Sequence, residues 1–256
     1  WKRDLQKNYE LYLFLVPAVV SVFIFSYLPM YGIQIAFKDF KPAKGILGSK
    51  WVGLKWFERF FSGYQFTEVL SNTVLLSVLL LICSFPIPIL FALIVNQYKE
   101  GKFRRLLQTV SYAPHFISTV VMVGMVLLFL SPSSGLYGTI VRLCGGDPKN
   151  IMGDAGMFRP IYILSDIWQH TGWDSIIYLA ALSAINQDLY DAANVDGAGR
   201  MKKIWYIELP ALKETSIILL ILRLGNIMSM GFEKAYLMQN NLNLATSEII
   251  ATYVYK

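Results

Sequence analysis

Of the 256 residues of the chain, 55% are hydrophobic, whereas apolar residues make up roughly 45–50% of an ordinary soluble domain. The formal net charge of +6 is typical of a membrane protein with basic loops and does not imply nucleic-acid binding. The two cysteines, Cys83 and Cys144, are too few and too far apart for a disulfide framework or a metal site. The composition therefore favours a protein of the lipid bilayer.

Five apolar stretches are long enough to cross a membrane, because a spanning helix needs about 20 mostly apolar residues. They are Leu11–Phe37, Val69–Val95, Leu107–Leu130, Pro160–Ile185 and Ser216–Phe232. The first follows a basic segment, Trp1–Lys7, as the apolar part of a signal peptide would. However, it is long, contains two prolines and lacks a small-x-small cleavage site. We therefore predict an all-α, polytopic fold in which residues 1–256 form a single transmembrane domain.

The segment between the first two spans, Lys38–Phe66, is basic, with six Lys or Arg against two acidic residues. Such a surface is either simply solvated or attracts an acidic partner or an anionic substrate by long-range steering. Prolines follow in the second and third spans, at Pro86, Pro88 and Pro114. They predict kinks, which are either fixed or act as hinges.

Polar side chains recur along the fourth span. Asp166, His170 and Asp174 lie four residues apart, so they share one face of a helix that we expect to begin at Pro160. Polar residues inside a span are costly and usually face a cavity or a partner. These three do not make a zinc site, because no further ligands stand at ligand spacing.

A loop of 29 residues, 186–214, separates the fourth and fifth spans. Asn186 is expected to cap a helix from Gln187 to about Asp196, with carboxylates in its early turns, where they meet the positive end of the helix dipole. Glycine breaks then turn the chain, since glycine adopts positive φ without strain. A second short helix is expected over Met201–Leu209, closed by Pro210.

The fifth span carries Arg223 near its middle, at roughly the depth of Asp174. We predict that the two side chains pair, either as a structural ion pair or through contact with a substrate. Asn226 follows Arg223 by three residues, so it extends the same polar face. Both residues are candidates for the lining of a cavity.

The loop contains a spaced set of residues: Asp191-Ala192-Ala193, three residues, Gly197, nine residues, then Ile207-Glu208-Leu209-Pro210. This set resembles the cytoplasmic coupling loop of binding-protein-dependent ABC importers, whose permeases carry Glu-Ala-Ala, Gly and Ile-x-Leu-Pro at the same intervals. Asp191 stands where the family has Glu, which keeps the carboxylate and removes one methylene. The resemblance implies that the following residues dock an ATPase: Asp191, Ala192, Ala193, Asp196, Gly197, Gly199, Arg200, Ile207, Leu209 and Pro210.

The resemblance covers nearly the whole chain. The segments Tyr27–Gly32, Ala36–Phe40, Trp51–Leu54 and Trp168–Arg200 are similar to permeases for complex oligosaccharides, the branch of aldouronate and pectin-fragment importers. The family's last span is absent, so a sixth span is expected beyond Lys256. The resemblance implies half of a translocation path for a uronate-containing or other complex plant or algal sugar.

A path for sugar rings needs aromatic platforms beside hydrogen-bonding groups, and the fourth and fifth spans offer both. Trp168 is equally well explained as an interfacial anchor. The candidate path residues are Asp166, Trp168, His170, Trp173, Asp174, Tyr178, Arg223 and Asn226.

Charge does not orient the chain, since alternation of the five spans puts eleven Lys or Arg on each side, with Lys234 among those opposite the loop 186–214. The resemblance places that loop and the N-terminus in the cytoplasm of a cell with an inner membrane. It also implies the partners, which are a second permease subunit, an ATPase dimer, an extracellular solute-binding protein and membrane lipid. ATP and Mg²⁺ belong to the ATPase, and no cofactor, metal or catalytic residue is expected in this chain.

Three other functions compete with this interpretation. No G-x-x-x-x-G-K-[ST] phosphate loop occurs in the sequence, so ATP must be hydrolysed by another subunit, which supports the permease interpretation. A membrane-embedded enzyme would need a constellation such as His-Glu-x-x-His, and the chain has only His115 and His170. A secondary transporter predicts an inverted internal repeat, which we do not find, whereas an ABC permease for another solute stays open.

Overall fold

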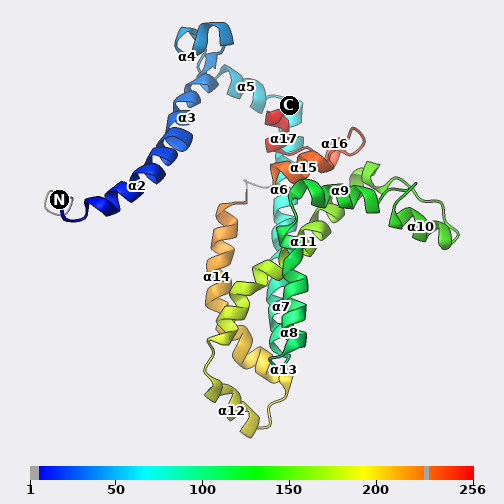
Figure 1. Cartoon of the computed structure of the whole chain (residues 1–256). Coiled ribbons are helices and arrows are strands. Elements are labelled where there is room, and N and C mark those ends of the chain that lie inside the picture. Colours follow the sequence, from blue (N-terminus) through cyan, green and yellow to red (C-terminus); the bar gives the residue numbers. More distant parts are fainter. Residues whose placement is uncertain (1–5, 228–230) are drawn as a thin grey trace. The chain divides into compact units, whose positions relative to one another are not determined.

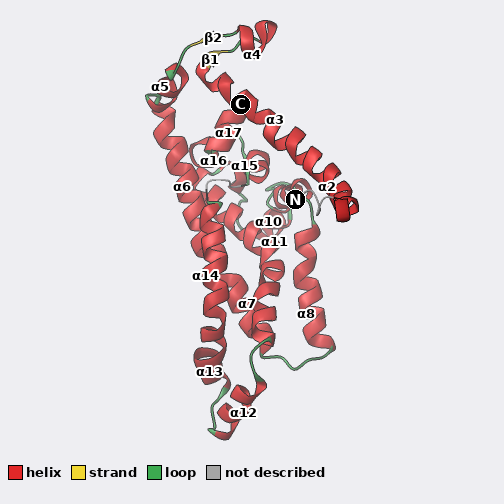
Figure 2. Cartoon of the chain, turned by 90° about the vertical axis from the view of Figure 1, so that its left-hand side faces the viewer, coloured by secondary structure: helices red, strands yellow, loops and turns green. Residues whose placement is uncertain are grey.

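A computed structural model describes residues 6–227 and 231–256, and these residues are almost entirely helical (Figures 1 and 2). The chain divides into two compact units, residues 1–66 and 67–256, which we describe separately. The single domain over 1–256 stays a prediction. Most of the basic segment Trp1–Lys7 lies outside the described residues.

The first unit begins with a long apolar helical run. Its elements are α2 (Tyr9–Val22), η1 (Phe23–Tyr27), α3 (Leu28–Met30), η2 (Tyr31–Phe37), β1 (Lys38–Asp39), η3 (Pro42–Lys44), α4 (Gly45–Gly48), β2 (Lys50–Trp51) and α5 (Lys55–Phe61). The π-helical turn η1 comes just before Pro29. Proline lacks an N–H and its ring crowds the carbonyl four residues earlier, and a wider turn accommodates it without ending the helix.

A two-stranded hairpin brings together two of the segments that carried the family resemblance. β1 and β2 pair antiparallel, with Lys38 opposite Trp51. The ring of Phe37 stacks on that of Trp51, with centroids 5.6 Å apart. Lys38 is buried and its Nζ donates to the carbonyl of Ile46 (2.8 Å). Lys38 is therefore not part of the exposed basic surface, which is formed by the other five bases of the segment: Lys41, Lys44, Lys50, Lys55 and Arg59.

The second unit is a helical bundle. Its elements are α6 (Tyr64–Ser84), α7 (Pro86–Asn96), α8 (Lys102–Tyr112), η4 (Ala113–Phe116), α9 (Thr119–Phe129), α10 (Leu136–Leu143), η5 (Ile151–Gly153), α11 (Ala155–Ser183), α12 (Gln187–Val195), α13 (Arg200–Lys203), η6 (Ile204–Glu208), α14 (Leu209–Gly225), α15 (Phe232–Met238), α16 (Leu244–Ser247) and α17 (Ile250–Tyr255). Within this unit, α12 and α13 lie at one end and α15–α17 at the other (Figures 1 and 2).

The helix α11 is the centre of this bundle. It packs against α7, α8, α14 and α16, and it contributes to both buried apolar clusters. Near its start, Phe158 and Tyr162 pack with Met238 of α15. Near its end, Tyr178 and Leu182 pack with residues of α7 and α14. Neighbouring elements are therefore positioned mainly by their contacts with α11.

By length and hydropathy, two helices among the described residues qualify as membrane spans, Tyr9–Phe37 and Tyr64–Asn96, and a bent pair brings the possible number to three. The second predicted span thus runs through Pro86 as one helix. The fourth and fifth spans form helices, α11 and α14, but do not meet this criterion. α11 begins at Ala155, so Pro160 lies inside it rather than at its start.

The predicted third span is not one straight helix. Lys102–Phe116 and Thr119–Phe129 meet at a bend of 100°. Gln169 of α11, which is buried, donates from Nε2 to the carbonyl of Ile117 at the bend (2.9 Å). Ser118 caps the helix that follows by accepting from the N–H of Val121. Backbone groups freed by a break inside a membrane protein need such partners.

The predicted fifth span is also displaced. Pro210 does not close the second loop helix, because α13, η6 and α14 run continuously through it. The π-helical turn η6 precedes Pro210 as η1 precedes Pro29, and relieves the same clash. α14 ends at Gly225 instead of continuing to Phe232, and residues 228–230 lie outside the described residues. Arg223 is consequently in the last turn of α14 and not at the middle of a span.

Gly172 allows α11 and α8 to approach closely. A Cβ atom at Gly172 would lie 2.0 Å from the carbonyl oxygen of Ser111 in α8. We expect Gly172→Ala to push the helices apart and to cost at least about 1–3 kcal/mol, the usual cost of overpacking. The matched control is Gly124→Ala in α9, where a Cβ meets nothing within 4 Å. Thermal unfolding in detergent should show a lower Tm for the first variant only; equal Tm values would contradict the close contact.

Candidate functional site

A cavity of about 710 Å³ opens between α6, α11, α14 and α15 of the second unit. Its polar lining comes largely from one face of α11 and from the facing ends of α14 and α15. The polar side chains include Asp166, Gln169, His170, Arg223, Asn226 and Lys234. Four of these residues were predicted for a substrate path, namely Asp166, His170, Arg223 and Asn226.

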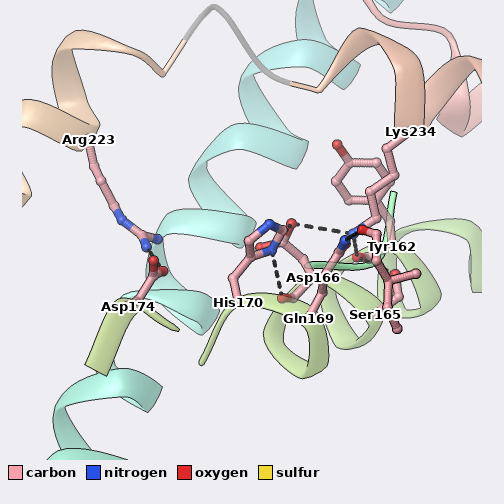
Figure 3. Close-up of polar contacts among 9 residues, drawn as sticks. Tyr162, Ser165, Asp166, Gln169, His170, Asp174, Arg223 and Lys234 are labelled. Atoms are coloured by element: carbon pink, nitrogen blue, oxygen red, sulfur yellow. Dashed lines mark hydrogen bonds and ion pairs between the residues drawn. The ribbon is translucent and has the colours of Figure 1, made fainter. Parts of the chain in front are cut away.

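At one side of the cavity, Arg223 pairs directly with Asp174, as predicted (Figure 3). The Nη2 atom of Arg223 donates to Oδ2 of Asp174. The Arg223 side chain stays 35% exposed and that of Asp174 27% exposed. The guanidinium has five N–H donors, so the pair leaves donors free on the cavity side. Asn226, which follows it, donates to the carbonyl of Leu222 (3.0 Å).

At the other side, Asp166 is shared between two bases (Figure 3). Its Oδ1 lies 3.3 Å from Nζ of Lys234 and 3.4 Å from Nδ1 of His170. Lys234 is only 5% exposed, donates to the carbonyl of Tyr162 (3.0 Å) and lies over the ring of that tyrosine. A buried ammonium needs such compensation, so Lys234 ties α15 to α11.

The aromatic residues predicted for the path lie elsewhere. Trp168 borders a separate apolar cavity with residues of α9. Trp173 stacks on His115, with ring centroids 4.4 Å apart. Tyr178 is buried in the apolar cluster shared with α7 and α14. None of the three lines the cavity at Asp166 and Arg223. Trp168 leaves α11 on another face, whereas Trp173 and Tyr178 lie further along the helix, where other partners cover them.

The helix α12 is specified by its caps, as the sequence predicts. The side chain of Asn186 accepts from the N–H of Asp188 (3.0 Å). At the other end, Gly197 has φ +69°. The N–H of Ala198 bonds to the carbonyl of Ala193 (2.8 Å) and that of Gly197 to Asn194 (3.1 Å), which is the Schellman pattern. Gly199 has an ordinary φ of −70°, so the turn requires only the first glycine.

The outer surface of α12 and α13 is exposed. Asp191, Ala192, Asp196 and Gly197 are exposed, and Ala193 is half-buried. Large apolar side chains are also uncovered on these helices and on η6, which follows α13: Leu189, Val195, Met201, Trp205 and Tyr206. Lys203 bonds to Asn194 and ties α13 to α12. An exposed apolar surface of this kind indicates a contact with another protein or with lipid.

Two residues of these sites were missed in the sequence. Lys234 was counted only as an external loop charge, and Glu208 only as the variable position of Ile-x-Leu-Pro. The sequence does indicate a role for Glu208, because an acidic residue between Ile207 and Leu209 on an apolar helix needs a buried hydrogen-bond partner. Its carboxylate accepts hydrogen bonds from α7 and α12. Among the described residues, no group of three or more His, Cys, Asp or Glu could hold a metal ion.

The sequence of the chain is similar to a known family and to individual members of it. Residues 84–256 match the model of the family described as binding-protein-dependent transport system inner membrane component. The chain is 44% identical over 251 residues to the polygalacturonan/rhamnogalacturonan transport system permease protein YteP of Bacillus subtilis (strain 168), covering 98% of this chain and 78% of that protein. It is 41% identical over 255 residues to protein LplB of the same organism, covering 100% and 80%.

Solved structures agree with the sequence comparison. One is a bacterial ABC transporter involved in the import of the acidic polysaccharide alginate, with a TM-score of 0.90 and 41% identity over 99% of this chain and 85% of that chain. Another is a bacterial alginate ABC transporter in complex with an alginate pentasaccharide-bound periplasmic protein, with a TM-score of 0.89 and 40% identity over 99% and 84%. Both the sequence and the fold are thus similar to those of transport proteins.

The buried and the half-exposed ion pairs should differ in their contribution to stability. Asp166→Asn leaves the ammonium of Lys234 buried without its carboxylate, which we expect to cost about 3–5 kcal/mol. Asp174→Asn, the matched control on the same helix, should cost about 0–1 kcal/mol because water reaches that pair. Unfolding in detergent measures both, and Asp166→Asn with Lys234→Met should recover part of the loss. Equal effects of the two single variants would contradict this assignment.

Proposed function

The chain belongs to the binding-protein-dependent inner membrane transport components, and on that premise we propose that it forms half of the translocation path of an importer for uronate-containing oligosaccharides. It is a multi-pass ABC importer permease of the inner membrane rather than an enzyme. The strongest support for the proposed mechanism is that the first part of the spaced motif, Asp191 to Gly197, lies on the exposed helix α12 and on the turn that ends it. The second part, Ile207 to Pro210, follows in η6 and the start of α14. A membrane chain that keeps so ordered and apolar a loop outside its bundle offers it to a partner.

The exposed surface of α12 and α13 is the proposed docking site for the ATPase. Ala192 and Gly197 have small side chains or none, so a partner's backbone can approach closely, while Val195 is 88% exposed. The remaining proposed coupling residues either surround Ala192 and Gly197 or belong to the helical run from α13 to α14. They are Asp191, Ala193, Asp196, Gly199, Arg200, Ile207, Leu209 and Pro210. In this proposal the loop and the N-terminus lie in the cytoplasm. The loop 186–214 is part of a single transmembrane domain in this proposal.

The cavity on α11 is the proposed part of the path that meets the sugar. Three bases border it, Arg223, His170 and Lys234, and a uronate carries a carboxylate that bases attract. The relatives named for polygalacturonan, rhamnogalacturonan and alginate act on acidic sugars. Asp174 enters the proposed site through its pair with Arg223. Trp168, Trp173 and Tyr178 are not part of this cavity, and we assign them to packing.

The complete importer requires further subunits. We propose a second permease subunit, an ATPase dimer that binds ATP and Mg²⁺, and an extracellular solute-binding protein, with membrane lipid around the spans. The similar alginate transporter in complex with a periplasmic protein supports the last partner. No cofactor is assigned to this chain itself. The exposed bases of the segment 41–59 are suited to attract an acidic partner or substrate.

Substitutions on the docking surface should prevent binding of the ATPase. Ala192→Trp fills the space that the small side chain leaves, and Gly197→Leu adds strain at positive φ. The matched control is Gly101→Leu in an exposed loop on the same side, where the backbone is extended and a Cβ meets nothing. Copurification of the ATPase with the permease measures the effect. Retention of the ATPase by both α12 variants, or transport without any ATPase, would contradict the proposed function.

Variants of the Arg223–Asp174 pair distinguish a substrate contact from a structural ion pair. If Arg223 binds a uronate carboxylate, Arg223→Gln should lower uptake of oligogalacturonate or alginate oligosaccharides by at least about tenfold, since hydrogen bonds to charged groups contribute about 1.5–3 kcal/mol. Asp174→Asn should lower it much less, because the guanidinium remains. Reconstituted vesicles containing the whole transporter provide the assay, with Lys149→Gln, an exposed base outside the cavity, as control. Equal losses in both pair variants would show a structural role.

A further inference from the structure

The carboxylate of Glu208 is buried at the point where the loop 186–214 joins the bundle. Glu208 is only 2% exposed and is the one acidic side chain in the fully buried class among residues 6–227 and 231–256. The ion pairs found in this part of the chain do not include it. Its charge is therefore balanced by neutral hydrogen-bond donors.

Three donors surround this carboxylate. Asn96 donates from Nδ2 to Oε1 (3.0 Å), and Gln97 donates from Nε2 to both oxygens (3.0 Å each). The hydroxyl of Tyr190 donates to Oε1 (3.2 Å). Burial and the neighbouring Glu208 charge raise the pKa of Tyr190 to about 12, so the hydroxyl keeps its proton at neutral pH. Hydrogen bonds to an ionised acceptor are about twice as strong as neutral ones.

The donors come from two different parts of the bundle. Asn96 is the last residue of α7 and Gln97 follows it directly, while Tyr190 lies in the middle of α12. Glu208 itself ends η6, at the start of α14. A single side chain thus joins the helix that carries the docking surface to the ends of two bundle helices.

Without this junction, α12 would be held mainly by its flanking turns and by the bond between Lys203 and Asn194. α7, by contrast, is firmly placed, because Ala92 and Leu93 are buried against Leu179 and Leu182 of α11. A force applied to α12 reaches this packed core through Tyr190, Glu208 and Gln97. Packed cores shift as rigid bodies rather than deform continuously.

We propose that Glu208 is a positioning residue for energy coupling, which holds α12, the end of α7 and the start of α14 as one rigid unit. The inference rests on the proposed docking of an ATPase at α12. The two proposals concern different quantities. Docking determines whether the ATPase binds, whereas Glu208 determines how much of the ATPase's movement reaches the bundle. Removal of the charge should uncouple hydrolysis from transport without releasing the ATPase.

The test uses the assembled transporter in vesicles, with copurified ATPase, ATP hydrolysis and uptake of an alginate or galacturonate oligosaccharide measured together. Glu208→Gln should retain the ATPase and lower the sugar transported per ATP by about tenfold, the size expected when a charged hydrogen-bond partner is removed. The control is Glu214→Gln, an exposed acid in the same loop, which should leave the ratio unchanged.

A swapped pair separates positioning from a general loss of stability. Gln97→Glu combined with Glu208→Gln restores an amide facing a carboxylate and should recover most of the transport per ATP, whereas Gln97→Glu alone places two carboxylates together and should not. If Glu208→Gln does not assemble, Tyr190→Phe removes one donor and should lower the ratio partially. An unchanged ratio in Glu208→Gln, or no recovery in the swapped pair, would overturn the inference while ATPase binding at α12 still stands. Failure of the unmodified chain to bind the ATPase would instead overturn the proposed function.

Discussion

The two carboxylates on one face of α11 each bind a base from a later segment of the chain. Asp174 binds Arg223 in the last turn of α14, and Asp166 binds Lys234 in α15. Loss of the buried pair would leave the charge of Lys234 unpaired in the interior at a cost of several kcal/mol, so it fixes α15 against α11. The half-exposed pair with Arg223 contributes less to stability but sets the position of that side chain at the cavity. The cavity of about 710 Å³ lies between these two attachments. Its polar lining is thus a consequence of how the last helices are held.

Local signals in the sequence predicted the structure of the first helix of the loop 186–214 well. The Asn186 cap, the end of α12 and the positive φ of Gly197 depend on neighbouring residues only, so one short segment contains the information. The family and the helical permease fold followed from the same motif and are confirmed. The pairing of Asp174 with Arg223 was also predictable, because two opposite charges in apolar helices have few alternatives.

Features that depend on distant partners could not be predicted. The bend after Phe116 is stabilised by Gln169, 52 residues beyond Ile117, and Lys234 finds Asp166 68 residues earlier. In the sequence, neither Gln169 nor Lys234 differs from the other polar residues of its segment in a way that reveals its distant partner. Pro210 was expected to end a helix, but the π-helical turn before it absorbs the clash. The aromatic residues were expected beside the polar groups of the path. Trp168 leaves α11 on another face, whereas Trp173 shares the face of Asp166 by the 3.6-residue period but lies further along the helix and packs on His115.

The two halves of α11 differ in how they can respond to a force. The half that leads to α12 is close-packed, with Gly172 against Ser111 and apolar contacts to α7. The other half is packed through Phe158 and Tyr162 on one side and borders the cavity on another, where ion pairs hold it. Close-packed interiors transmit displacement because they contain little free volume, whereas ion pairs beside a cavity can exchange partners with water or with a bound carboxylate. If α12 docks the ATPase as proposed, its displacement passes along the close-packed contacts of α11 and becomes a rearrangement only at the cavity, where a sugar would be held.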